Sequence, residues 1–158
     1  MKIARSQKSL ACLQPIKLLR KLIYNTILYK NHLMTCFWDG NINAIMRTFR
    51  LAKRPSPYEF VQFLQRNNRR TINVLWNGNR LTEKEMMENM ERVRSLDINT
   101  ITRGYDCSTC DPFLLLIADI FKVHVIHNYN GHKITYQCMN CDNTTLKFSS
   151  DRGHFWHA

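Results

Sequence analysis

The amino-acid sequence predicts a single α+β domain in which helices pack on a small, antiparallel-rich sheet. Apolar residues recur with helical spacing through the first two thirds of the chain and alternate with polar residues through the last third. Helical segments followed by a run of strands are typical of the α+β class. The length of 158 residues and the hydrophobic content of 44% suit one domain with a substantial core.

The start of the chain differs in composition from the rest. No Asp or Glu precedes Asp39, whereas seven Lys and Arg residues do. We therefore divide the chain into a basic, partly helical extension over residues 1–34 and a globular domain over 35–158. A helix is predicted over 15–29, with Pro15 near its first turn. Its apolar positions have helical spacing: Leu18, Leu19, Leu22, Ile23 and Ile27.

Three more helices are predicted in the first half of the domain, over 43–53, 58–67 and 82–93. Asn41 or Asn43 can cap the first of them, and Pro55 and Pro57 follow its end. Thr82 and Glu85 have the spacing of a capping box. A short β-rich segment, 71–76, lies before the last of the three and ends at the turn Asn77-Gly78.

The second half begins with a strongly apolar helix over 112–121, for which Asp111 is the expected N-cap and Pro112 the first helical residue. The apolar period then changes from helical to two, which predicts strands over 123–127, 132–137 and 144–148. Asn130-Gly131 is typical of a hairpin turn between the first two strands. A last strand is expected around His154.

The charge of the chain favours acidic partners. The formal net charge is +11 and the isoelectric point is near 9.7, which suits nucleic acid, an anionic membrane surface or an acidic protein face. Two basic clusters could neutralise phosphates, although no recognisable nucleic-acid motif accompanies them. The clusters consist of Arg47, Arg50, Lys53 and Arg54, and of Arg66, Arg69 and Arg70.

Without a recognisable export signal, the sequence favours a cytoplasmic location. No segment is long and apolar enough to span a bilayer, and the start lacks the apolar run of a secretory signal. A basic, acid-free start with an amphipathic stretch also occurs in transit peptides, so mitochondrial import is the alternative. The six cysteines are then expected to be reduced, which favours metal binding or redox chemistry over disulfides.

Three motifs in order resemble the ovarian-tumour (OTU) family of cysteine proteases, which remove ubiquitin. They are Asp39-Gly40-Asn41, the apolar unit 112–127, and Gly153-His154-Phe155-Trp156. The resemblance covers roughly residues 35–158. It implies a papain-like fold, a monomeric thiol-dependent hydrolase, and ubiquitin or a ubiquitin-like protein as partner.

The family's functional positions carry over with two departures. His154 matches the catalytic histidine, and Asp39, Gly40 and Asn41 match the loop that receives the oxyanion. Ile42 stands at the position of the nucleophilic cysteine and cannot attack a carbonyl. In addition, Trp156 stands where many members have an Asp or Asn that orients the histidine. The resemblance therefore implies an impaired or inactive enzyme that retains ubiquitin or protein binding, because loss of the nucleophile removes nearly all of the rate.

Another thiol could replace the missing one. Cys36 lies three residues before Asp39 and could act if the loop were reorganised or the motif were displaced along the chain. A thiol nucleophile works best at a helix N-terminus, where the helix dipole favours the thiolate. The default interpretation of Cys36 is a structural thiol.

Two CxxC pairs suggest a different function, a basic zinc-dependent or nucleic-acid-binding module. The pairs are Cys107 with Cys110 and Cys138 with Cys141, and four thiolates suit tetrahedral Zn²⁺. The predicted element lengths place the second pair at the far end of the sheet, which favours separate thiols. Three histidines on the predicted strands could add ligands: His124, His127 and His132.

Overall fold

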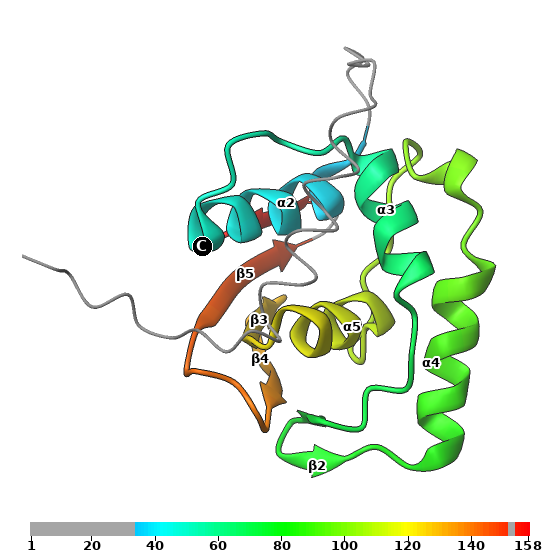
Figure 1. The fold of residues 1–158 in the computed structure, drawn as a ribbon, viewed down its shortest axis with the longest axis vertical. Helices are drawn as coiled ribbons and strands as arrows, with labels where there is room; N and C mark the ends of the chain where they lie inside the picture. Colours follow the sequence, from blue (N-terminus) through cyan, green and yellow to red (C-terminus); the bar gives the residue numbers. More distant parts are fainter. Residues whose placement is uncertain (1–33, 152–153) are drawn as a thin grey trace, which may run out of the picture.

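The structure is a computed structural model that describes residues 34–151 and 154–158. The predicted helix over 15–29 and nearly all of the basic extension lie outside these residues. The described part contains the α-helices α2 (Cys36–Phe49), α3 (Pro57–Arg66), α4 (Glu83–Ser95) and α5 (Pro112–Phe121), a short 3₁₀ helix η1 (Ile98–Thr100), and one mixed sheet (Figure 1). The predicted α+β class is therefore confirmed.

The sheet has the strand order β2-β1-β4-β3-β5-β6. Its strands are β1 (Val74–Trp76), β2 (Asn79–Arg80), β3 (His124–Tyr129), β4 (His132–Cys138), β5 (Thr145–Asp151) and β6 (His154–His157). All neighbours pair antiparallel except β3 and β5, which are parallel. Strand β4 runs opposite to β3, and β5 runs opposite to β4. Strand β5 therefore runs in the same direction as β3, beside which it inserts.

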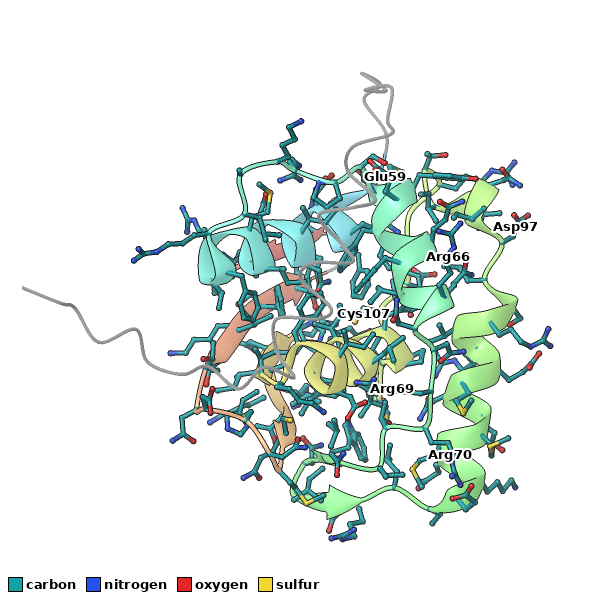
Figure 2. All side chains as sticks on the ribbon, in the orientation of Figure 1. Glu59, Arg66, Arg69, Arg70, Asp97 and Cys107 are labelled. Atoms are coloured by element: carbon teal, nitrogen blue, oxygen red, sulfur yellow. The ribbon has the colours of Figure 1, made fainter. Side chains whose placement is uncertain are left out.

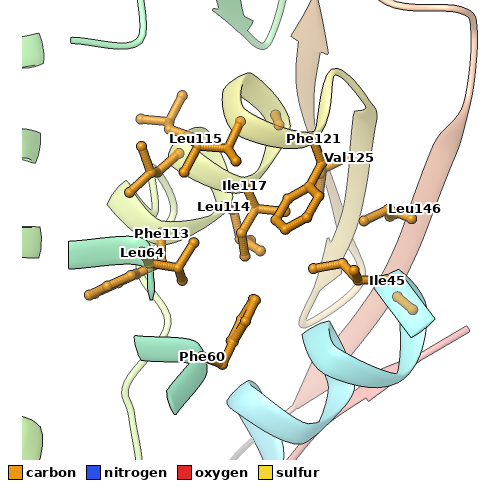
Figure 3. Close-up of a cluster of buried hydrophobic side chains, with 14 of the residues drawn as sticks. Ile45, Phe60, Leu64, Phe113, Leu114, Leu115, Ile117, Phe121, Val125 and Leu146 are labelled. Atoms are coloured by element: carbon orange, nitrogen blue, oxygen red, sulfur yellow. The ribbon is translucent and has the colours of Figure 1, made fainter. Parts of the chain in front are cut away.

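The core lies between α5 and one face of the sheet. All ten residues of α5 are buried, and its apolar side chains meet those of α2, α3 and the central strands (Figure 3). Ile45 from α2, Phe60 from α3, and Val125 and Leu146 from the sheet belong to this cluster. Burial of this apolar surface stabilises the domain by roughly 25 cal/mol for each Å² removed from water.

Capping boxes begin two of the helices. The predicted box of Thr82 and Glu85 is confirmed at α4, and Ser56 and Glu59, which the sequence analysis did not single out, form another at α3. Helix α4 lies at the periphery beside α3 and α5 (Figure 1), and Val93 is its buried residue. Among the described residues, no helix is both long and apolar enough to cross a membrane.

Helix α2 begins seven residues earlier than predicted. The sequence predicts a loop at 39–41 and a helix from Asn43, whereas the helix begins at Cys36 and ends at Phe49. Gly40 suggests a loop by local propensity, but here it allows close packing: a Cβ at this position would lie 2.8 Å from the ring of Phe155. Asn41 is buried and its side chain donates to the carbonyl of Phe37 one turn earlier. Tertiary packing thus overrides local propensity here.

Candidate functional site

Cys36 is the first helical residue of α2, and its side chain is half-buried. The first turn of a helix has backbone N–H groups without intrahelical acceptors, and the helix dipole makes this end positive. Cys36 therefore lies at the positive end of α2.

Strand β6 lies along α2 and runs in the same direction. The ring centroids of Phe155 and Phe37 are 4.8 Å apart, and Gly40 also faces the Phe155 ring. Two residues later along β6, the backbone nitrogen of His157 is 3.7 Å from a Cβ built at Gly40. The contacts thus advance together along the strand and the helix.

The far end of β6 shows the same direction. Burial lowers the pKa of His157, and the nearby charge of Arg47 lowers it further, so His157 lies toward the later turns of α2. The first residue of β6, His154, therefore lies at the same end of α2 as Cys36. The parallel course of β6 and α2 thus places the backbone of His154 toward the end of α2 at which Cys36 lies.

The strand directs alternate side chains to opposite sides. Phe155 is buried on the side of α2, whereas His154 and Trp156 are exposed and alternate with it. His154 is at the end of the strand, and β6 is the edge strand of the sheet. Its side chain therefore lies outside the α2–β6 interface, on the side of β6 opposite to Phe155.

The residues predicted to form the oxyanion loop belong to helix α2 instead. Gly40 and Asn41 are buried within α2, and the backbone N–H of Asp39 donates to the carbonyl of Thr35 at 2.9 Å, as in a regular helix. That loop prediction is wrong because the segment is helical. Ile42 is 1% exposed and packs in the core one and a half turns beyond the helix start, so it does not lie at the site.

A polar network that the sequence analysis missed fixes the first turn of α2. The Thr35 hydroxyl donates to one carboxylate oxygen of Asp39 at 2.5 Å, and Arg54 donates to the other at 2.6 Å. Arg54 also donates to the side-chain oxygen of Asn43. The network joins the segment after α2 to its beginning. An acidic residue in the first turn of a helix was the available sequence signal.

The segment 101–111 forms a wall beside this end of α2. Met34 forms an isolated bridge with Arg103, and its backbone N–H donates to Thr102. The ring of Tyr105 lies 4.4 Å from that of Phe37. Asp111 anchors the segment by accepting from the hydroxyl of Tyr105 and from the N–H of Ser108. A chain that approached Cys36 would therefore meet a backbone segment held in place on one side.

Behind this wall lies another thiol–imidazole pair, in which the thiol is half-buried and the imidazole is buried. The Cys107 sulfur is 3.9 Å from Nδ1 of His127, and Nε2 of His127 is 2.7 Å from the Ser150 hydroxyl. Burial lowers the pKa of His127 to about 4. Burial and the neighbouring Asp111 raise the pKa of Cys107. The pair is therefore neutral at pH 7 and suits a structural role.

We expect this pair to make the fold acid-sensitive. Because burial lowers the pKa of His127 from 6.5 to about 4, the unfolded chain takes up a proton first as the pH falls. The stabilisation is complete above pH 6.5 and is lost between that value and about pH 4, by about 3 kcal/mol in total. Urea unfolding of the wild type and of His127→Gln across this range measures the difference. Parallel pH curves for the two proteins would contradict the prediction.

The four cysteines of the predicted zinc site contact different partners. Cys107 lies beside His127, whereas the Cys141 sulfur is 3.0 Å from Nε2 of His124. Burial and Asp111 raise the pKa of Cys110 to about 11. Within residues 34–151 and 154–158, no group of three or more His, Cys, Asp or Glu residues is arranged to hold a metal ion. The fourth cysteine, Cys138, lies on the core side of β4.

Three of the seven residues in the basic clusters pair with acids. Arg54, Arg69 and Arg70 form ion pairs with Asp39, Asp119 and Glu83. Figure 2 shows Arg66, Arg69 and Arg70 at α3 and along the segment that follows it. The described residues contain 15 Lys and Arg against 12 Asp and Glu, and residues 1–33 contribute seven of the other positive charges. The excess charge therefore belongs mainly to the basic extension.

Three separate parts of the chain contribute to the candidate site. They are the thiol at the start of α2, the histidine at the start of β6, and the wall formed by 101–111. Comparison of the sequence and the structure with protein-family models, curated proteins and solved structures finds no match.

Proposed function

We propose that the chain is an OTU-like thiol hydrolase that cleaves ubiquitin or a ubiquitin-like protein from its conjugates, with Cys36 as nucleophile. The observation that carries this proposal is the position of Cys36 as the first residue of α2, at the end where β6 begins with His154. A thiol at this position removes the reason to expect an inactive protein, because the chemistry no longer depends on Ile42.

The helix start supplies two of the requirements for thiol catalysis. It presents the thiol of Cys36 at the positive end of the helix dipole, and the N–H groups of a helix's first turn have no intrahelical acceptors. An oxyanion that forms beside the thiol would be stabilised by such preorganised donors. The network of Thr35, Asp39 and Arg54 holds this turn in one conformation.

His154 is the candidate general base. It takes the proton from the thiol, and the sulfur attacks the isopeptide carbonyl carbon to give a tetrahedral oxyanion. The imidazolium returns the proton to the leaving amine, which departs and leaves a thioester on Cys36. Water, deprotonated by the same imidazole, then releases the carboxylate and restores the thiol. Trp156 cannot orient the imidazole as a carboxylate would, so we expect a slow enzyme.

The substrate part of the proposal rests on the OTU resemblance, and the nucleophile part rests on the geometry of α2 and β6. The two parts fail separately. A folded sample that binds ubiquitin but does not react would be a pseudo-enzyme, as the Ile42 alignment implies. A sample that neither reacts nor binds ubiquitin would favour the basic nucleic-acid-binding alternative.

A ubiquitin probe with a thiol-reactive group at its C-terminus tests the nucleophile directly. We expect one adduct, mapped to Cys36 by mass spectrometry, and its loss in Cys36→Ser. Hydrolysis of a fluorogenic ubiquitin amide should fall on the order of 10⁴-fold or more in this variant. Cys141→Ser is the matched control, because Cys141 is also half-buried and lies beside a histidine.

Two histidine variants distinguish the candidate bases. His154→Ala should remove hydrolysis, typically by 10²- to 10⁴-fold, because it removes the proton acceptor. His157→Ala should retain it, because His157 lies toward the later turns of α2. An adduct at a thiol other than Cys36, or equal losses in the two histidine variants, would overturn this assignment.

A further inference from the structure

A half-buried thiol–imidazole pair lies far from Cys36 in the sequence, and the proposed hydrolase does not use it. The sulfur of Cys141 is 3.0 Å from Nε2 of His124, and both side chains are half-buried. Cys141 lies in the connection between β4 and β5, and His124 is the first residue of β3. The other ring nitrogen of His124, Nδ1, is buried and has no partner among the described residues.

The sheet determines which side of the molecule this pair occupies. Val123 and Val125, on either side of His124, are fully buried toward the core. By strand alternation, His124 is on the opposite face of the sheet from α5. The backbone N–H of His124 donates to the carbonyl of Thr144 at 2.8 Å, which fixes the imidazole beside the β4–β5 connection.

The same CxxC motif contains a natural comparison. Cys138 is 2% exposed, and its thiol donates to the side-chain oxygen of Asn140 at 3.2 Å. Burial raises the pKa of Cys138. Two thiols three residues apart thus differ in both respects that control reactivity, because Cys141 has access and a neighbouring base whereas Cys138 has neither.

We propose that Cys141 is a site of oxidative modification by hydroperoxides, activated by His124. The imidazole takes the thiol proton, and the thiolate attacks one oxygen of the peroxide. The O–O bond breaks as the S–O bond forms, so the sulfur is oxidised to a sulfenic acid and the peroxide is reduced. The departing oxygen takes the proton from the imidazolium and leaves as water or an alcohol. This inference does not depend on the proposed hydrolase.

The experiment uses the full chain, hydrogen peroxide and a sulfenic-acid trap, with the modified residues mapped by mass spectrometry. We expect trapped sulfenic acid at Cys141 at peroxide concentrations that leave Cys138 unmodified. His124→Gln should lower the rate at Cys141 by about tenfold at pH 7, because only a small percentage of an ordinary thiol is ionised at that pH. The site assignment is independent of whatever occurs at Cys36.

Alkylation with iodoacetamide separates activation from access. Near pH 10, where an accessible thiol is ionised without help, Cys141 should react equally fast in the wild type and in His124→Gln. At pH 7 the variant should be slower. A variant that is slower at both values would show that His124 only shapes the surface and would overturn the proposal. Equal oxidation of Cys138 and Cys141 in the wild type would also overturn it.

Discussion

Replacement of Asp111 by alanine is expected to lower the free energy of unfolding by about 4 kcal/mol. Asp111 is fully buried and caps α5 by accepting from the N–H groups of Phe113 and Leu114. It also accepts from the hydroxyl of Tyr105 at 2.8 Å and from the N–H of Ser108 at 3.2 Å. Alanine leaves these four donors without an acceptor, and each unsatisfied buried group costs about 1–3 kcal/mol before relaxation.

Urea unfolding measures this loss, and Asp97→Ala is the matched control. Asp97 also caps a helix, η1, by accepting from the N–H of Asn99, but it is exposed at the end of α4 (Figure 2). Its replacement should cost less than about 1 kcal/mol, because water satisfies the released donor. Similar losses for the two variants would show that burial of the cap does not matter.

The same substitution should affect the proposed hydrolase. Asp111 fixes Tyr105, whose ring contacts Phe37 in the first turn of α2. Release of the wall formed by 101–111 changes the surroundings of Cys36, so we expect slower reaction with the ubiquitin probe even where the variant is still folded. Asp111→Asn keeps one side-chain oxygen for the α5 cap and should lie between the wild type and the alanine variant in stability.

The sequence predicts those parts of the fold that local residues determine. Asp111 followed by Pro112 marks the start of α5, and the capping box of Thr82 and Glu85 marks the start of α4. Asn130-Gly131 has positive φ at both residues, which is the geometry that a tight hairpin requires. In each case a side chain or backbone preference acts within a few residues.

Long-range packing determines what the sequence analysis missed. Asp39, Gly40 and Asn41 have loop-forming preferences, but Phe155 packs on Gly40 from more than a hundred residues away and α2 continues through them. The parallel pairing of β3 with β5 depends on which edge of β3 the returning chain joins. Cys107 with His127 and Cys141 with His124 are likewise pairs of a loop thiol and a strand histidine, and no local pattern indicates them.

For the candidate site, the sequence named residues whose role stays a prediction, and it misjudged where α2 begins. Cys36 and His154 were both candidates, with Ile42 placed at the nucleophile position. Whether the thiol of Cys36 lies at a helix start depends on where α2 begins. A helix that begins seven residues later, as predicted, would leave Cys36 outside it and favour an inactive protein. The direction of β6 along α2, which brings His154 to that end, follows from contacts that no single motif contains.

The contact of Gly40 with Phe155 provides the most direct test of this arrangement. Gly40→Ala is expected to lower the free energy of unfolding by about 2 kcal/mol, although alanine favours a helix over glycine by about 1 kcal/mol. The added Cβ would lie 2.8 Å from one atom of the Phe155 ring and 3.1 Å from the next, so the ring and β6 must move. Phe155 is 6% exposed and has little room to move.

Displacement of β6 should also slow the proposed reaction, because β6 carries His154. A shift of about 1 Å in a catalytic group typically costs on the order of 100-fold in rate. Urea unfolding and the fluorogenic ubiquitin amide measure the two effects, with Arg47→Ala on the exposed side of α2 as the control for helix propensity. A Gly40→Ala protein that matched or exceeded the wild type in both measurements would show that α2 does not pack on β6 in this way.

A smaller side chain at position 155 should relieve the clash. Phe155→Leu alone removes part of the aromatic packing against Phe37 and Phe148 and should be destabilising. Combined with Gly40→Ala, it should cost less than the sum of the two single losses, because leucine leaves room for the new methyl group. Residues in contact commonly show such coupling, by about 0.5–3 kcal/mol. Recovery of hydrolysis in the double variant would tie the position of β6, and with it His154, to the activity of Cys36.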